Sequence, residues 1–328
     1  MKSLDHYWYD NNIVAWFLWP LSLLFRVLVW FRFKAYQSGL FQSFKAPKPV
    51  IVIGNISVGG TGKTPLIIEL SKLLASQDYK VGIISRGYGG SGPWPHQLNT
   101  KSQAEESGDE PVQLYQRTGL PIVVGPDRVE DASLLCDQND IDIILADDGL
   151  QHYRLQRELE LVVVDQQRQF GNGFCLPAGP LREPLSRLDS RHGKKQSWCV
   201  YNGGQQKYSF SIKPKMVKNL QSGEERSLQS FVNMSVHAVA GIGNPQRFFT
   251  MLAEHGINVT EHTFPDHYQY KSSDVGFDDD LPVLMTEKDS VKCTPSDNAK
   301  LWYVAIDIVL SDDFINDFTK QIGQLTNG

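Results

Sequence analysis

The sequence predicts an α/β protein: a mostly parallel sheet with helices on both faces, followed by a smaller α/β C-terminal domain. The first observation is that short apolar runs rich in β-branched residues alternate with segments of helical periodicity, which is typical of parallel sheets. The second is a glycine-rich turn that stands directly between the first such run and the first helical segment. The third is the length of 328 residues, which favours two domains over one.

The first domain carries the alternating pattern. Residues 50–53 form a short apolar run preceded by prolines, as expected of a buried parallel strand. In sheets of this kind, ligands bind beyond the carboxyl ends of the strands, so we expect the functional residues there. The further predicted strands are residues 81–84, 121–124, 141–146 and 159–164, and the predicted helices are residues 65–76 and 129–138.

The pattern changes after residue 198. The chain is then polar up to residue 232, and Asn202-Gly203-Gly204 predicts a hairpin turn between two short strands. A second α/β unit follows, with strands predicted at residues 236–240, 282–285 and 302–306 and helices at residues 248–254 and 314–322. The predicted divisions are an N-terminal membrane-associating helix at 1–34, a P-loop domain at 35–198, a linker with a short β-hairpin at 199–232, and the C-terminal domain at 233–328.

The first 34 residues are unusually apolar and aromatic. Residues 13–25 are apolar apart from Pro20 and Ser22, Arg26 interrupts the run, and four tryptophans lie in the segment. Tryptophan and basic side chains favour the headgroup boundary of a bilayer, so the segment favours a helix that lies on the membrane surface. A single membrane span and a buried core helix are the alternatives.

Composition limits the partners. The formal net charge of −5 gives no overall positive field to attract a phosphate backbone, so no nucleic-acid partner is expected. The four cysteines are scattered without a Cys-x-x-Cys pair, which predicts neither a disulfide framework nor a zinc site.

The glycine-rich turn has the features of a phosphate-binding loop (P-loop), which makes the predicted fold P-loop NTPase-like. The backbone N–H groups of such a loop and the N-terminus of the following helix bind anions. We expect Lys63 to reach the β- and γ-phosphates of ATP and the Thr64 hydroxyl to bind Mg²⁺, although Ser57 replaces the usual first glycine. The predicted nucleotide-binding residues are Ser57, Val58, Gly59, Gly60, Thr61, Gly62, Lys63 and Thr64.

A second element is an apolar strand that ends in two acids. Asp147 and Asp148 are predicted to hold Mg²⁺ directly or through water, although Asp-Asp-Gly is also ordinary turn chemistry. Two related nucleotide-binding classes are not favoured. Val58 stands where partitioning-type ATPases carry a signature lysine, and Thr286-Glu287-Lys288-Asp289 has its lysine one place late for a guanine-binding motif.

Further short motifs follow in order between about residues 50 and 292. They are Gly-Gly-Thr-Gly-Lys-Thr-Pro at 59–65, Ser-Arg-Gly-Tyr-Gly at 85–89, Gly-Asp-Glu-Pro at 108–111, Gly-Pro-Asp-Arg at 125–128, Asp-Asp-Gly-Leu-Gln-His at 147–152, Leu-Pro-Ala-Gly-Pro-Leu-Arg-Glu at 176–183, Ala-Gly-Ile-Gly-Asn-Pro-Gln-Arg-Phe at 240–248, Phe-Pro-Asp-His-Tyr at 264–268 and Thr-Glu-Lys-Asp at 286–289. In this combination the sequence resembles the lipid A 4'-kinase (tetraacyldisaccharide 4'-kinase) family.

The resemblance implies an activity and a location. It implies a two-domain kinase that is peripheral on the cytoplasmic face of the bacterial inner membrane. The enzyme would transfer the γ-phosphate of ATP to the 4'-hydroxyl of a tetraacylated glucosamine disaccharide 1-phosphate in lipid A biosynthesis. The apolar N-terminus suits such a lipid substrate.

The resemblance also implies roles for single residues. Asp109 matches a catalytic aspartate and His267 its partner, although each alone is more often a structural residue. Arg182 matches an arginine that neutralises phosphate charge, and Glu183 is expected to assist the metal. Residues expected to hold the sugar or the 1-phosphate are Arg86, Tyr88, Arg128, Gln151 and His152.

Two other functions compete with this hypothesis. One is a membrane-associated P-loop ATPase that acts as a nucleotide-switched binding protein. The other is a soluble kinase or ligase that acts on a small metabolite, in which the aromatic N-terminal helix would be part of the core.

Overall fold

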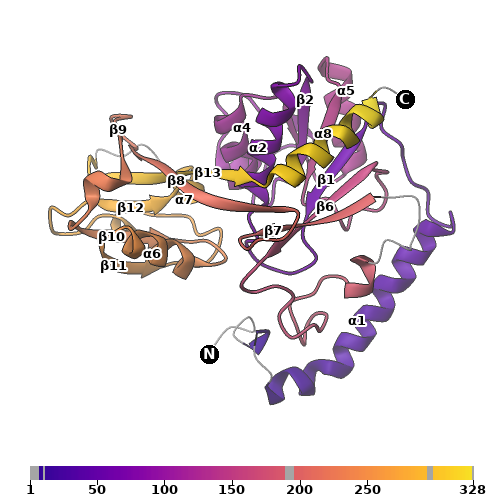
Figure 1. The fold of residues 1–328 in the computed structure, drawn as a ribbon, viewed down its shortest axis with the longest axis horizontal. Helices are drawn as coiled ribbons and strands as arrows, with labels where there is room; N and C mark the ends of the chain where they lie inside the picture. Colours follow the sequence, from indigo (N-terminus) through magenta and orange to yellow (C-terminus); the bar gives the residue numbers. More distant parts are fainter. Residues whose placement is uncertain (1–6, 10–11, 189–195, 294–297, 327–328) are drawn as a thin grey trace.

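A computed structural model describes residues 7–9, 12–188, 196–293 and 298–326. Parts of the predicted segments 1–34, 35–198 and 233–328 therefore lie outside the described residues. Within the described part, thirteen strands form one sheet with the order β11-β10-β12-β13-β8-β7-β6-β1-β5-β2-β4-β3, and β9 pairs with β8. We call the elements from β1 to β7 the P-loop unit and those from β10 to α7 the C-terminal unit (Figure 1).

The P-loop unit has the predicted alternation of strands and helices. Strand β1 lies between β5 and β6 with parallel pairing on both sides. All of its residues are buried because helices pack on both faces of the sheet. The strands are β1 (Val50–Gly54), β2 (Val81–Ser85), β3 (His96–Gln97), β4 (Ile122–Val124), β5 (Ile143–Asp147), β6 (Leu159–Asp165) and β7 (Gln196–Asn202), and the helices are α2 (Lys63–Ala75), α3 (Ala104–Ser107), α4 (Asp109–Thr118) and α5 (Arg128–Gln138).

Helices cover both faces of this part of the sheet. On one face Leu66 and Leu70 of α2 and Leu114 of α4 pack into a core that is closed to solvent. On the other face Ala132 and Leu135 of α5 pack against the opposite sides of the same strands. The predicted fold class, a mostly parallel sheet with helices on both faces, is confirmed.

The C-terminal unit is a smaller parallel α/β layer. Strand β10 pairs in parallel with β11 and β12. Strand β11 was not predicted because it is an edge strand with a polar, largely exposed sequence rather than an apolar run. The elements are β10 (Ser235–Ala240), α6 (Pro245–Glu254), β11 (Asn258–Thr263), β12 (Val283–Thr286) and α7 (Glu287–Ser290).

Two long antiparallel strands connect the units. Strand β8 (Ser209–Asn219) pairs with β13 (Leu301–Leu310) from Phe210 to Asn219, and the pair runs between the units in Figure 1. The predicted hairpin around Asn202-Gly203-Gly204 is wrong, because β7 and β8 pair in parallel. The short β9 (Glu225–Arg226) pairs with β8 instead. The direction of β8 depends on its pairing with β13, which lies far along the chain, and the sequence around residues 202–204 does not indicate that pairing.

The last helix returns to the P-loop unit. Phe314, Phe318 and Ile322 of α8 (Asp312–Thr326) are fully buried in the same core as Leu66 of α2. The Gln77 amide also donates to the Thr319 hydroxyl at 2.9 Å. The C-terminal helix was predicted at the right place in the chain but assigned to the other domain.

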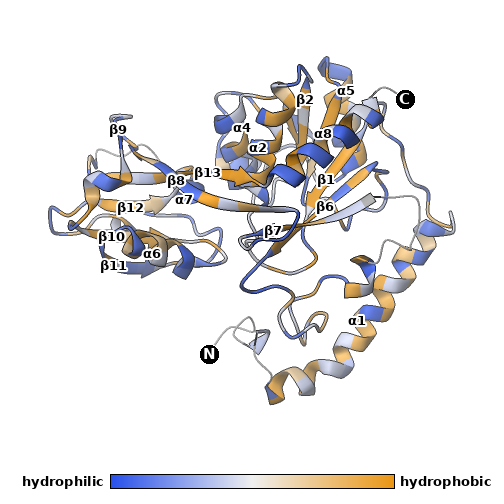
Figure 2. Ribbon diagram, in the orientation of Figure 1, coloured by the Kyte–Doolittle hydropathy of each residue, from blue (hydrophilic) through white to orange (hydrophobic). Residues whose placement is uncertain are grey.

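The N-terminal helix α1 (Ile13–Gln37) projects along the edge of the molecule (Figure 1) and is largely hydrophobic (Figure 2). The Asn12 side chain caps its first turn by accepting from the Ala15 N–H at 3.0 Å. Ser22 fixes its middle to the body by donating to the Cys175 carbonyl at 2.7 Å. Most of its apolar side chains face outward, with Ile13 84% and Phe17 83% exposed. Its length and composition suffice to cross a membrane.

Candidate active site

A cleft of about 1100 Å³ lies between the two units. Its walls come from the P-loop, from the ends of β2 and β5, and from the β10–α6 turn and α6 of the C-terminal unit. The predicted residues that line it are Val58, Gly59, Gly60, Thr61, Gly62, Lys63, Thr64, Arg86, Tyr88, Asp147, Asp148, Gln151, Arg182 and His267. Residues far apart in the sequence therefore meet at the carboxyl ends of the central strands.

The P-loop is held in a fixed shape. Gly62 has φ of +99°, and a Cβ there would lie 2.6 Å from the Asn202 amide nitrogen, so only glycine fits. The same Asn202 amide donates to the Thr61 carbonyl at 2.9 Å. Lys63 begins α2, and its ammonium lies 3.4 Å from Asn55 Oδ1 and 3.7 Å from Asp148 Oδ1. The lysine thus points into the cleft, where a phosphate would compete for its charge.

Ser57 lies behind this loop. It is 7% exposed, pairs through its backbone with Leu181, and is absent from the cleft wall. Its contact with the nucleotide therefore stays a prediction, and the structure shows only its backbone pairing behind the loop.

The two acids that follow β5 have different environments. Asp147 is buried and accepts from the Ser85 hydroxyl at 2.9 Å, and burial raises its pKa to about 7. Asp148 accepts from Arg182 at 3.0 Å. Burial would raise the pKa of Asp148, but Lys63 and Arg182 outweigh it and hold that pKa below its usual value. Asp148 also has φ of +48°, a strained conformation that is common at functional sites.

These acids suit a magnesium ion. The Oδ1 atoms of Asp147 and Asp148 are buried and have no hydrogen-bond partner among the described residues. Mg²⁺ is usually bound by one or two carboxylates together with substrate phosphates and waters. With the Thr64 hydroxyl on the same cleft wall, the donors fit that ion.

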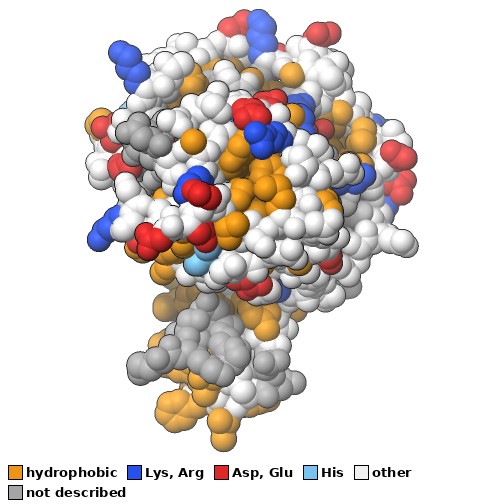
Figure 3. All heavy atoms as spheres, turned by 90° about the vertical axis from the view of Figure 1, so that its left-hand side faces the viewer, with side chains coloured by type: hydrophobic (Ala, Val, Ile, Leu, Met, Phe, Trp, Pro, Cys, Tyr) orange, Lys and Arg blue, Asp and Glu red, His pale blue; other side chains and the backbone are white. Residues whose placement is uncertain are grey.

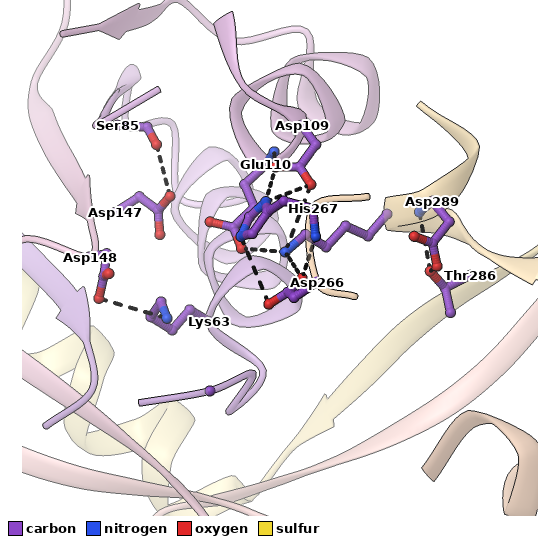
Figure 4. Close-up of polar contacts among 12 residues, drawn as sticks. Lys63, Ser85, Asp109, Glu110, Asp147, Asp148, Asp266, His267, Thr286 and Asp289 are labelled. Atoms are coloured by element: carbon purple, nitrogen blue, oxygen red, sulfur yellow. Dashed lines mark hydrogen bonds and ion pairs between the residues drawn. The ribbon is translucent and has the colours of Figure 1, made fainter. Parts of the chain in front are cut away.

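Asp109 and His267 meet across the cleft. Asp109 is the first residue of α4 in the P-loop unit, and His267 follows β11 in the C-terminal unit. His267 Nδ1 lies 3.0 Å from both carboxylate oxygens of Asp109 (Figure 4). The centroids of the Tyr88 ring and the imidazole are 4.9 Å apart. Burial would raise the pKa of Asp109, but the His267 hydrogen bond and Lys288 hold it below its usual value.

Lys288 is a cleft residue to which the sequence assigned no role. Its ammonium lies 3.0 Å from Glu110, 3.1 Å from Asp266 and 3.9 Å from Asp109. Burial would lower the pKa of Lys288, but these three carboxylates raise it. The sequence signal for Lys288 is the Thr-Glu-Lys-Asp motif, which contributes to the family resemblance but indicates no role for its lysine.

Three predicted site residues are placed differently. Arg128 is 2% exposed and donates to the Gly125 and Asp147 carbonyls, so it supports the end of β5 rather than facing a sugar. Glu183 is buried and bonded to the Tyr153 hydroxyl and Arg187, away from the cleft wall. His152 also lies outside the cleft wall, 3.7 Å from Asp127. Predicted metal and substrate contacts for these three are not supported.

The turn after β10 contacts the P-loop directly. A Cβ on Gly243 would lie 2.7 Å from the Gly60 nitrogen, and Arg168 donates to the Gly243 carbonyl at 3.0 Å. Arg247 of α6 donates to the Asn202 side chain at 2.8 Å, which in turn bonds the P-loop. These contacts assign a structural role to the Ala-Gly-Ile-Gly-Asn-Pro-Gln-Arg-Phe motif, for which the sequence alone suggested none.

Three features together define a P-loop phosphotransferase: a phosphate loop with its lysine, two neighbouring carboxylates that each keep one oxygen without a hydrogen bond, and an imidazole on the same cleft wall that is hydrogen-bonded to a carboxylate. Comparisons agree with that class. The family described as "Tetraacyldisaccharide-1-P 4'-kinase" (LpxK) matches residues 14–323. The chain belongs to this tetraacyldisaccharide 4'-kinase family, and the predicted family and enzyme class are confirmed.

Individual relatives support the assignment over nearly the whole chain. A tetraacyldisaccharide 4'-kinase of Nitrosococcus oceani is 47% identical over 94% of this chain and 90% of its own length. One from Pseudomonas aeruginosa is 44% identical over 97% of this chain and 96% of its own. The crystal structure of LpxK from Aquifex aeolicus in complex with ATP has a TM-score of 0.77 at 28% identity, covering 96% of this chain and 100% of that one. The alternative of a nucleotide-switched binding protein is not favoured.

Proposed function

We propose that this chain transfers the γ-phosphate of ATP to the 4'-hydroxyl of a tetraacyldisaccharide 1-phosphate, with Mg²⁺ as cofactor. The observation that carries the proposal is that Lys63 and His267 line the same cleft, and that His267 is hydrogen-bonded to the buried Asp109 behind it. A phosphate donor on the P-loop and a hydroxyl next to the imidazole would then meet in that cleft. The names of the relatives supply the identity of the acceptor.

The P-loop end would bind the nucleotide. Backbone N–H groups of the loop and the start of α2 favour binding of a phosphate chain. The Lys63 ammonium, which is paired with Asp148 in this structure, would bind the β- and γ-phosphates instead. Thr64, Asp147 and Asp148 would hold Mg²⁺, which neutralises phosphate charge when bound. Asp148 is favoured for direct contact because its pKa is held below its usual value, whereas burial raises the pKa of Asp147 to about 7.

The Asp109–His267 pair would accept the proton of the sugar hydroxyl. An ionised Asp109 only accepts hydrogen bonds, so Nδ1 of His267 carries the proton and Nε2 is the basic nitrogen. A general base of this kind contributes about 10²–10⁴-fold to a rate. Positioning and charge neutralisation by Lys63 and Arg182 supply the rest, as is usual for phosphoryl transfer.

Three exposed or half-buried cleft residues would hold the acceptor. Arg86, Tyr88 and Gln151 lie on the cleft wall between the P-loop and His267. Arg86 makes no hydrogen bond or ion pair with the described residues, so its guanidinium is free for an anionic group such as a sugar phosphate.

We also propose that α1 places the enzyme on the cytoplasmic face of the bacterial inner membrane. Its outward apolar side chains would be costly in water, and hydrophobic side chains gather where this part of the molecule projects below the body (Figure 3).

The test of membrane binding by α1 is co-flotation with phospholipid vesicles. Burying Phe or Leu is worth about 1.5–3 kcal/mol each, so Phe17→Ser with Leu24→Ser should weaken binding at least ~100-fold. A matched control is Val309→Ser, an exposed valine on β13. Unchanged flotation of the double variant would contradict the proposal.

The kinase assay tests the main proposal. Purified protein, Mg²⁺ and γ-labelled ATP are mixed with the tetraacyldisaccharide 1-phosphate, and label is followed into the lipid. We expect a lipid with a second phosphate, strong loss with Lys63→Met, and loss of turnover with nearly intact ATP affinity for Asp109→Asn. ATP turnover that is indifferent to the lipid would contradict lipid kinase activity.

A further inference from the structure

The Asp109–His267 pair exists only when the two units are held together, because one member comes from each. Asp109 is 4% exposed at the start of α4, while His267 lies in the C-terminal unit with φ of +61°. Positive φ values are uncommon outside glycine, although histidine adopts them more often than most residues. Because the pair spans the two units, the contacts around His267 determine whether it stays against Asp109.

Lys288 has the contacts for that task. Its ammonium joins Glu110 of the P-loop unit, at 3.0 Å, to Asp266 of the C-terminal unit, at 3.1 Å. Asp266 is the residue next to His267, and Glu110 is next to Asp109. Figure 4 shows these four residues converging on one point between the units. One cation thus bonds to the neighbour of each member of the pair.

The charge of Lys288 also acts on the pair itself. Among the described residues, Lys288 is the only lysine or arginine within ion-pair distance of Asp109, with its Nζ 3.9 Å from Asp109 Oδ2. The nearby Lys292 is fully buried and bound to Asp289 at 2.7 Å, so its charge is already compensated. Without a cation, a buried Asp109 with Glu110 and Asp266 close by would favour protonation. The charged and titratable groups around the pair are Glu110, Asp266, Lys288, Lys292 and Tyr88.

The segment that carries Lys288 is itself firmly placed. Arg117, at the other end of α4, donates to both oxygens of Glu287 at 2.8 Å. Asp289 accepts from the Thr286 hydroxyl at 2.6 Å and from the Gly241 N–H at 3.0 Å. The lysine therefore projects from a short helix that is bonded both to α4 and to the turn that contacts the P-loop.

We propose that Lys288 is a positioning residue for phosphoryl transfer: it joins the two units at Glu110 and Asp266 and keeps His267 against an ionised Asp109. The role rests on the proposed function, in which this pair accepts the hydroxyl proton. In this role Lys288 does not contact the reacting atoms.

The test compares Lys288→Ala and Lys288→Arg with Lys271→Ala, an exposed lysine four residues after His267. We expect Lys288→Ala to lower kcat about 10–100-fold, part of the rate that a general base provides. The KM for ATP should change less than about threefold, because the P-loop is untouched. The acidic limb of the pH–kcat profile should move to higher pH, since loss of a cation makes the pair easier to protonate. Lys288→Arg should keep most of the activity, and Lys271→Ala all of it.

Chemical rescue separates positioning by charge from a merely structural role. Lys288 lies on the cleft wall, so ethylammonium ions can enter the space left in Lys288→Ala. Ethylammonium should restore part of kcat and return the acidic limb, whereas tetramethylammonium, which has no N–H donor, should not. A normal kcat and pH profile in Lys288→Ala would overturn the proposal. So would a loss that neither arginine nor ethylammonium restores in a folded variant. Full activity of Asp109→Asn would instead contradict the base in the proposed function, and the role of Lys288 with it.

Discussion

Substituting Gly243 by alanine should uncouple the two units at the P-loop. The added Cβ would lie 2.7 Å from the Gly60 backbone nitrogen, whereas ordinary contacts begin at 3.4 Å. Neither group is the flexible end of a side chain, so the turn and the P-loop must separate by about 0.7 Å. Gly243 has no left-handed φ, so alanine itself adds no backbone strain.

The expected loss follows from that displacement. A misplacement of about 1 Å can cost about 10²-fold in rate, so we expect Gly243→Ala to lower kcat/KM for ATP about 10–100-fold, or roughly 1.4–2.7 kcal/mol. The assay is the initial rate of label transfer to the lipid at several ATP concentrations, with a thermal melt to show that the variant is folded. Gly323→Ala is the matched control, because a Cβ there meets no neighbour. Parental kinetics in a folded Gly243→Ala protein would show that this contact does not set the geometry of the cleft.

Two further predictions concern stability. Phe314→Ala should lower the free energy of unfolding in urea by about 3–5 kcal/mol, because Phe314 is fully buried against the P-loop unit. The control Asn316→Ala, at an exposed position of the same helix, should change it little. Equal effects of the two substitutions would contradict the packing of α8. His152 has its pKa lowered to about 4, chiefly by burial and by Arg128. Because His152 is harder to protonate in the folded state than in the unfolded state, its contribution to the free energy of unfolding is complete above about pH 6.5 and is lost as the pH falls toward 4. After allowance for its partial exposure, that contribution is roughly 1–2 kcal/mol. His152→Gln should remove that part of the pH dependence in urea titrations between pH 4 and 7, and an unchanged slope would contradict it.

Sequence reasoning identified the nucleotide end of the site because its signals are local. A glycine loop between a strand and a helix can be recognised within fourteen residues, from Ile51 to Thr64, and β5 ends in its acids as predicted. The bulk of the sheet followed for the same reason. Short apolar runs and helical periodicity report which faces of each segment are buried.

The features that local patterns did not reveal share a physical cause. Arg128 and Glu183 lie outside the cleft wall and are hydrogen-bonded to residues distant in the chain, so their functional roles stay predictions. The direction of β8 depends on β13, and the position of α8 depends on a hydrophobic face offered by α2. Each outcome is decided by a partner that no local pattern identifies.

Local sequence patterns were enough to predict a phosphate loop, a strand that ends in acids and an apolar N-terminal helix, and the family resemblance paired Asp109 with His267. The folded structure was needed to show that these two side chains are hydrogen-bonded, that Lys288 joins their neighbours, and that Gly243 contacts the P-loop. The reason is that backbone pattern and residue type govern local conformation and burial, whereas a contact between units requires both surfaces to be folded and packed first.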